Sequence, residues 1–86
     1  MIQGEFEILN ETGLHTRPGN DFVKLAKSYS CSITLRKQDK DVDAKSLLKI
    51  MKANVMKGDR IWLACDGEDE AAALSALGDY LKNLKE

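Results

Sequence analysis

GLHTRPGND, residues 13–21, contains the only histidine of the chain, His15, and its only proline, Pro18. Proline has a fixed φ angle and no N–H group, so it is tolerated in the first turn of a helix, where backbone donors are unpaired in any case. The stretch therefore predicts a loop that leads into a helix from about Thr16, with His15 at or near the N-cap.

The first turn of such a helix is suited to an anion, because it presents unpaired N–H groups and the positive end of the helix dipole. Taken alone, His15 is better explained as a loop histidine that makes a structural hydrogen bond. Its neighbours favour another interpretation, since a neutral histidine is a nucleophile and the guanidinium of Arg17 offers donors that match phosphate oxygens. We therefore expect a phosphoryl group at the helix start formed by Thr16, Arg17 and Pro18.

Hydrophobic periodicity on either side of this stretch predicts four strands and three helices. The strands are expected at residues 2–9, 31–36, near 42 and 60–65, and the helices at residues 16–28, 46–53 and 69–84. This order, βαββαβα, favours an α+β fold of two layers, in which helices cover one face of a largely antiparallel sheet. Trp62 is expected on the uncovered face, because Ile61 and Leu63 take the buried positions of an alternating strand.

The composition indicates a single soluble domain over residues 1–86. A net charge of -1 argues against broad binding to nucleic acid. No apolar run is long enough to span a membrane and the first residues lack the features of a signal peptide, so we expect a cytoplasmic protein without membrane insertion. Cys31 and Cys65 belong to no metal-binding pattern, and we expect two buried thiols, no metal and no cofactor.

The helix expected at 46–53 and the connector after it contain more apolar side chains than one buried face requires, so part of this set is expected to be exposed. The set is Leu47, Leu48, Ile50, Met51, Val55 and Met56. A rim of cationic side chains around this apolar set would suit a partner protein in which acidic residues surround an apolar hollow. The rim is expected to comprise Arg17, Lys24, Lys27, Lys45, Lys49 and Lys52. The predicted docking residues are Thr16, Arg17, Asn20, Lys24, Lys27, Leu47, Leu48, Lys49 and Met51.

Gly13-Leu14-His15-Thr16-Arg17-Pro18 resembles the active-site signature of the HPr family, the histidine-containing phosphocarriers of the bacterial phosphoenolpyruvate-dependent sugar phosphotransferase system. The resemblance covers the whole chain, because Lys45-Ser46-Leu47, Gly58 and Gly67-Glu68-Asp69-Glu70 also match. It implies an open-faced sandwich with strand order 1-4-2-3. It also implies that phosphorylated enzyme I transiently phosphorylates His15 on Nδ1, and that the group then passes to enzyme II A components. Such a protein is a stoichiometric carrier and not an enzyme, and we expect a monomer.

Ser46 has two compatible roles. Serine is a preferred N-cap residue and Ser46 directly precedes a helical segment, so it is expected to cap that helix. The resemblance adds a regulatory role, because a dedicated HPr kinase/phosphorylase phosphorylates the matching serine in many family members. A phosphate on Ser46 would suit the helix dipole and would place negative charge beside the docking residues.

Three positions depart from the common family pattern. Gly19 and Asn20 replace small helix formers such as alanine, and because glycine in a helix costs about 1 kcal/mol relative to alanine, the first turn is expected to be looser. Asn54 replaces a glycine, a mild change because asparagine tolerates left-handed backbone angles. Neither change removes a chemical group from the predicted site.

Other functions remain open from the sequence. A regulatory phosphorelay, nitrogen-related or signalling, could use the same signature without a role in sugar transport. A small acyl-phosphate hydrolase could combine an α+β sheet with an arginine and a turn that binds phosphate, but it would not store phosphate on His15. A nucleic-acid or protein-binding module is disfavoured, since an aromatic content of 6% offers no stacking platform.

Overall fold

The helices and strands of the computed structural model, which describes residues 1–84, follow the predicted order βαββαβα. They are β1 (Ile2–Glu7), α1 (Thr16–Lys27), β2 (Ser32–Lys37), β3 (Lys40–Asp43), α2 (Leu47–Ala53), β4 (Arg60–Asp66) and α3 (Glu70–Asn83). The α+β class is confirmed. The first strand is shorter than predicted, because its pairing with β4 ends at Glu7 and Arg60, although buried and exposed side chains still alternate through Leu9, which is 65% exposed.

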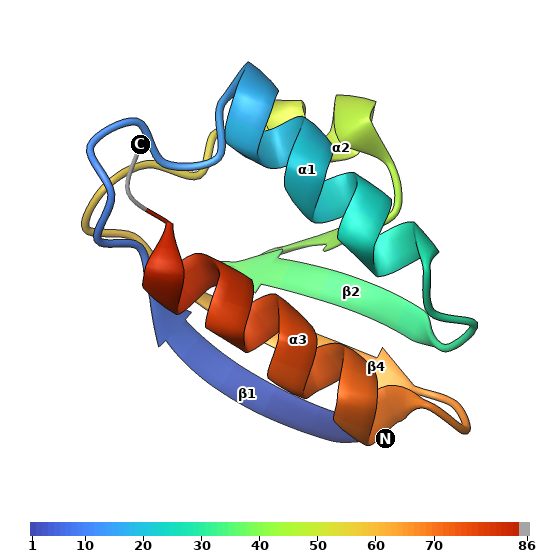
Figure 1. The fold of residues 1–86 in the computed structure, drawn as a ribbon. Helices are drawn as coiled ribbons and strands as arrows, with labels where there is room; N and C mark the ends of the chain where they lie inside the picture. The colour runs from blue at the N-terminus through green and yellow to red at the C-terminus, as the bar shows by residue number, and fades with distance from the viewer. Residues whose placement is uncertain (85–86) are drawn as a thin grey trace.

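The four strands form one antiparallel sheet in the order β1-β4-β2-β3. This is the order that the HPr resemblance implies. All three helices lie on the same side of the sheet and leave its other side uncovered (Figure 1). In β4, Ile61 and Leu63 are buried beneath the helices, whereas Trp62 between them is half-buried and points to the uncovered side, as predicted.

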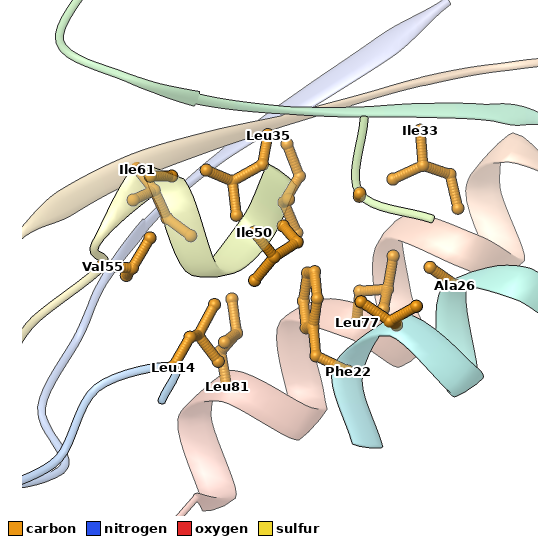
Figure 2. Close-up of a cluster of buried hydrophobic side chains, with 14 of the residues drawn as sticks. Leu14, Phe22, Ala26, Ile33, Leu35, Ile50, Val55, Ile61, Leu77 and Leu81 are labelled. Atoms are coloured by element: carbon orange, nitrogen blue, oxygen red, sulfur yellow. The ribbon is translucent and has the colours of Figure 1, made fainter. Parts of the chain in front are cut away.

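The core fills the space between the sheet and the helices (Figure 2). Each helix contributes a fully buried side chain to it, Phe22 from α1, Ile50 from α2 and Leu77 from α3. They meet Leu35 and Ile61 of the sheet. A buried side chain of this size contributes about 1.5–3 kcal/mol. Tertiary packing therefore holds the seven-residue α2 and fixes the start of α1 relative to the sheet.

The two cysteines are free and buried, as expected. Burial raises the pKa of Cys31 to about 11. It also raises the pKa of Cys65. Both thiols are therefore protonated at neutral pH and poor nucleophiles. Across residues 1–84, no helix has the length and apolar character to cross a bilayer, and no three His, Cys, Asp or Glu side chains are grouped to hold a metal ion.

Candidate functional site

The loop that leads into α1 is fastened to the connector between α2 and β4. Gly13 has a left-handed φ of +60°, and a Cβ atom at this position would overlap the carbonyl oxygen of Val55 and lie 2.7 Å from Met56 Cα. The next residue, Leu14, donates its N–H to that Val55 oxygen at 3.0 Å. The buried Asn10 donates from Nδ2 to the Gly13 oxygen at 2.8 Å. Only glycine fits this close contact of two backbone segments.

Charged pairs support the same connector. Lys57 Nζ lies 2.7 Å from Glu11 Oε1, and this hydrogen bond lowers the pKa of the Glu11 carboxyl group. Lys37 Nζ lies 2.9 Å from Asp59 Oδ2, and the hydrogen bond from Lys37 is the largest of the causes that lower the pKa of Asp59. The Lys57–Glu11 pair is exposed and such a pair contributes little individually, whereas Lys37 and Asp59 are partly buried. The role of the two pairs here is to join the loop, the connector and β2 at one corner of the fold.

The helix begins as the sequence predicts. His15 is the N-cap of α1, with φ -81° and ψ -167°, and its carbonyl oxygen accepts the N–H of Gly19 at 2.7 Å. Within the described chain, the His15 side chain makes no capping hydrogen bond and the first turn contains no acidic residue. The exposed imidazole therefore lies beside a positive helix end that no carboxylate of that turn offsets.

An open hollow of about 790 Å³ lies at this helix start. Its lining comprises Thr12, His15, Thr16, Arg17, Asn20 and Leu47. The structure thus brings His15 and Arg17 together with Leu47 of α2. A histidine nucleophile, a guanidinium and a helix N-terminus around one hollow can receive a phosphoryl group and balance its charge. Thr12 was not predicted, because a polar residue in a loop gives no distinctive signal.

The predicted docking residues divide into two groups. Thr16, Arg17, Asn20 and Leu47 line the hollow, whereas Lys24, Lys27, Leu48, Lys49 and Met51 do not. The apolar set of the α2 region is partly exposed, as expected. Leu48 is 66% exposed, while Ile50 and Val55 belong to the core. Among the cations of the predicted rim, Lys45 donates from Nζ to the Tyr29 oxygen at 2.7 Å, just beyond the end of α1.

Gly19 has a packing role that the sequence did not reveal. It is buried, and a Cβ atom here would lie 3.1 Å from the Leu14 oxygen and 3.4 Å from the sulfur of Met51. The absence of a side chain lets α1 pass close to its own entry loop and to α2. Helix propensity predicts a looser first turn at Gly19, but close packing around this residue restrains the turn.

Ser46 and Asn54 delimit α2. The Ser46 hydroxyl accepts the N–H of Lys49 at 3.4 Å, a long capping bond that confirms the expected N-cap. Asn54 is the C-cap and adopts the left-handed conformation, with φ 54° and ψ 52°. Its tolerance of these angles explains why the departure from glycine is mild.

Tyr80 of α3 is far from the start of α1 in the sequence but contacts it in the fold. Its hydroxyl donates to the Pro18 oxygen at 3.2 Å. Its ring centroid lies 6.3 Å from that of Phe22. The sequence did not single out Tyr80, because periodicity assigns it to a helix but does not reveal a partner 62 positions earlier.

Comparisons with known proteins agree with this geometry. The family model described as "PTS HPr component phosphorylation site" matches residues 2–83. The phosphocarrier protein HPr of Borreliella burgdorferi is 37% identical over 86 residues, which cover all of both chains. The crystal structure of HPr-C-His from Thermoanaerobacter tengcongensis is 40% identical and superposes with a TM-score of 0.93, covering 95% of this chain and 92% of that one.

A second solved structure concerns the oligomeric state. It is an HPr dimer from Thermoanaerobacter tengcongensis, 40% identical, with a TM-score of 0.76 over 95% of this chain and 94% of that one. The dimer is a property of that protein. For the present chain, the monomer expected from the sequence stays a prediction.

Proposed function

The chain belongs to the HPr family, the phosphocarriers of the phosphotransferase system, and on this premise we propose that it carries phosphoryl groups from phosphorylated enzyme I to enzyme II A components. In this proposal His15 Nδ1 forms the bond to phosphorus as the bond to the donor group of enzyme I breaks. In the second transfer, the bond between His15 Nδ1 and phosphorus breaks as the enzyme II A component forms its own bond to phosphorus. The protein is regenerated in each cycle as a stoichiometric carrier in the cytoplasm, with no cofactor.

One observation carries the proposal, namely the exposed N-cap histidine that shares a hollow with Arg17 at a helix start free of acidic residues. The guanidinium and the first-turn N–H groups can balance the charge of the migrating group. The hollow is open, so the phosphoryl group stays accessible to the next partner. This arrangement suits a carrier better than a hydrolase, which would have to place and activate a water molecule.

The test is incubation of the protein with enzyme I and phosphoenolpyruvate, followed by mass analysis. We expect one phosphoryl group per chain, labile in acid and stable in base as a phosphohistidine is. A chain that takes up no phosphate would contradict the proposal, and so would continuous phosphate release without a labelled intermediate, which is the hydrolase outcome. Subsequent transfer to a sugar-specific A component separates the sugar system from a regulatory phosphorelay.

We expect the exposed lysines of the docking residues to accelerate association with acidic partners. Reversing the charge of both residues, Lys24→Glu with Lys49→Glu, should slow phosphoryl transfer from enzyme I by about tenfold at low salt. The difference should shrink as salt is added, because screening removes long-range attraction. Stopped-flow transfer at several ionic strengths measures this. Lys40→Glu on β3 is the matched control and should transfer normally; a defect of equal size at all salt concentrations would exclude the electrostatic role.

We also propose that HPr kinase/phosphorylase modifies Ser46 as a regulatory site. The hydroxyl is partly exposed and its capping bond is long, so it can be modified at small cost to α2. With ATP and a lysate of the source organism, we expect a phosphate that survives acid and maps to residue 46. Ser46→Ala should lack it and Ser28→Ala should keep it. A lysate in which wild-type protein gains no phosphoserine would contradict the proposal.

A further inference from the structure

Two hydrogen bonds connect Tyr80 to the backbone of the proposed phosphate acceptor. The Tyr80 hydroxyl donates to the Pro18 oxygen at 3.2 Å. The peptide that carries this oxygen also carries the N–H of Gly19, which donates to the His15 oxygen at 2.7 Å. The order of groups is therefore hydroxyl, peptide unit and His15 carbonyl. Because donors polarise the peptide that accepts them, hydrogen bonds joined through one peptide strengthen each other.

The surroundings make this connection rigid. Pro18 and Gly19 are buried, and Gly19 is packed against Leu14 and Met51. The Tyr80 ring is half-buried and lies beside the fully buried Phe22. A tyrosine ring has few rotatable bonds, so a packed ring holds its hydroxyl in one place. By contrast, the His15 side chain is exposed and makes no capping hydrogen bond, so the backbone at the helix start sets the direction in which the imidazole points.

We propose that Tyr80 is a positioning residue for phosphoryl transfer, which acts through the Pro18–Gly19 peptide to fix the backbone orientation of His15 and of the first helical turn. The inference rests on the proposed carrier function of His15. Tyr80 lines a hollow between α1 and α3 that does not include His15, and Arg17 lines both this hollow and the one that contains His15. Tyr80 is therefore assigned a positioning role and no contact with the phosphoryl group. It belongs to α3, whereas the predicted docking residues belong to α1 and α2.

This placement predicts a particular kinetic signature for Tyr80→Phe. We expect kcat for phosphorylation by enzyme I to fall about threefold to tenfold, because a small misorientation at the reacting group costs rate, while KM stays unchanged because the docking residues are intact. Tyr29→Phe is the matched control, since it removes the other tyrosine hydroxyl of the chain, and it should change neither constant. An unchanged kcat in Tyr80→Phe would overturn the inference, and so would a rise in KM alone.

A second variant distinguishes an effect of the missing hydroxyl on kcat from an effect of reduced folding stability. Tyr80→Leu removes the ring contact with Phe22 as well as the hydroxyl, so it should unfold at lower urea concentration than Tyr80→Phe. Both variants are assayed at a temperature where urea titration shows them folded. We expect equal kcat values, because both lack the hydroxyl. A kcat that instead falls in proportion to the loss of stability would show a purely structural role and overturn the inference.

Amide NMR of the unphosphorylated protein tests the connection without enzyme I. Loss of the hydroxyl should shift the Gly19 N–H signal in Tyr80→Phe and leave it in place in Tyr29→Phe. If wild-type protein accepted no phosphate while the Gly19 signal shifted, the carrier function would fail and the hydrogen-bonded connection would stand. An unshifted Gly19 signal would overturn the inference even in a protein that is phosphorylated normally.

Discussion

Replacing His15 with alanine is expected to abolish phosphorylation by enzyme I and phosphoenolpyruvate. The imidazole supplies the nitrogen that forms the bond to phosphorus, and alanine has no nucleophile. Arg17 and the first-turn N–H groups would remain, but they can only balance charge. Mass analysis after incubation with the donor should therefore show unmodified protein, whereas the wild type gains one phosphoryl group.

The fold of this variant should be unchanged. His15 caps α1 through its backbone and its side chain is exposed, so the free energy of unfolding should move by no more than about 0.5 kcal/mol. Urea unfolding provides this control, and Thr12→Ala, which changes a lining residue of the same hollow that is not a nucleophile for this transfer, should still be labelled. A His15→Ala chain that acquired phosphate would place the acceptor elsewhere and refute the proposed function.

Gly13→Ala should have the largest effect on stability among substitutions near the site. An alanine at a left-handed φ of +60° is strained, and its methyl group would overlap the Val55 oxygen, which also accepts the N–H of Leu14. The strain and the displaced backbone together should lower the free energy of unfolding by about 3–5 kcal/mol. Urea titration followed by circular dichroism measures this loss.

Gly58→Ala is the matched control for backbone strain. Gly58 also has a positive φ, +90°, but a Cβ atom there meets no atom within 4 Å. Substitution of Gly58 should therefore lower the free energy of unfolding only by the strain of an alanine at a positive φ, about 1–2 kcal/mol. Equal losses at the two positions would show that the overlap with Val55 contributes nothing and would contradict the structural explanation.

Local chemistry made the helix start predictable from the sequence. Pro18 restricts the backbone where a first turn can accept it, and this placed His15 at the N-cap. Ser46 at the start of α2 was found for a similar reason, since a serine before an apolar helical segment is a familiar N-cap pattern. The order of strands came from the resemblance, because periodicity identifies strands but does not say which of them are neighbours.

The contacts that tighten the site were not predictable in this way. Leu14 meets Val55, and Tyr80 meets Pro18, through backbone oxygen atoms that every residue possesses. No residue type signals such a partner far away in the chain. Gly19 shows the same limit, because helix propensity describes its cost in an isolated helix and not the space that Leu14 and Met51 leave around it.

The half-buried Trp62 on the uncovered face has a practical consequence. It is the only tryptophan of the chain, and the sheet separates it from the helices that form the His15 hollow. Its fluorescence emission should change when the sheet unfolds and should stay constant while phosphoryl groups arrive and leave. Trp62 is therefore an intrinsic fluorescent probe that reports whether the sheet is folded, independently of phosphoryl transfer at His15.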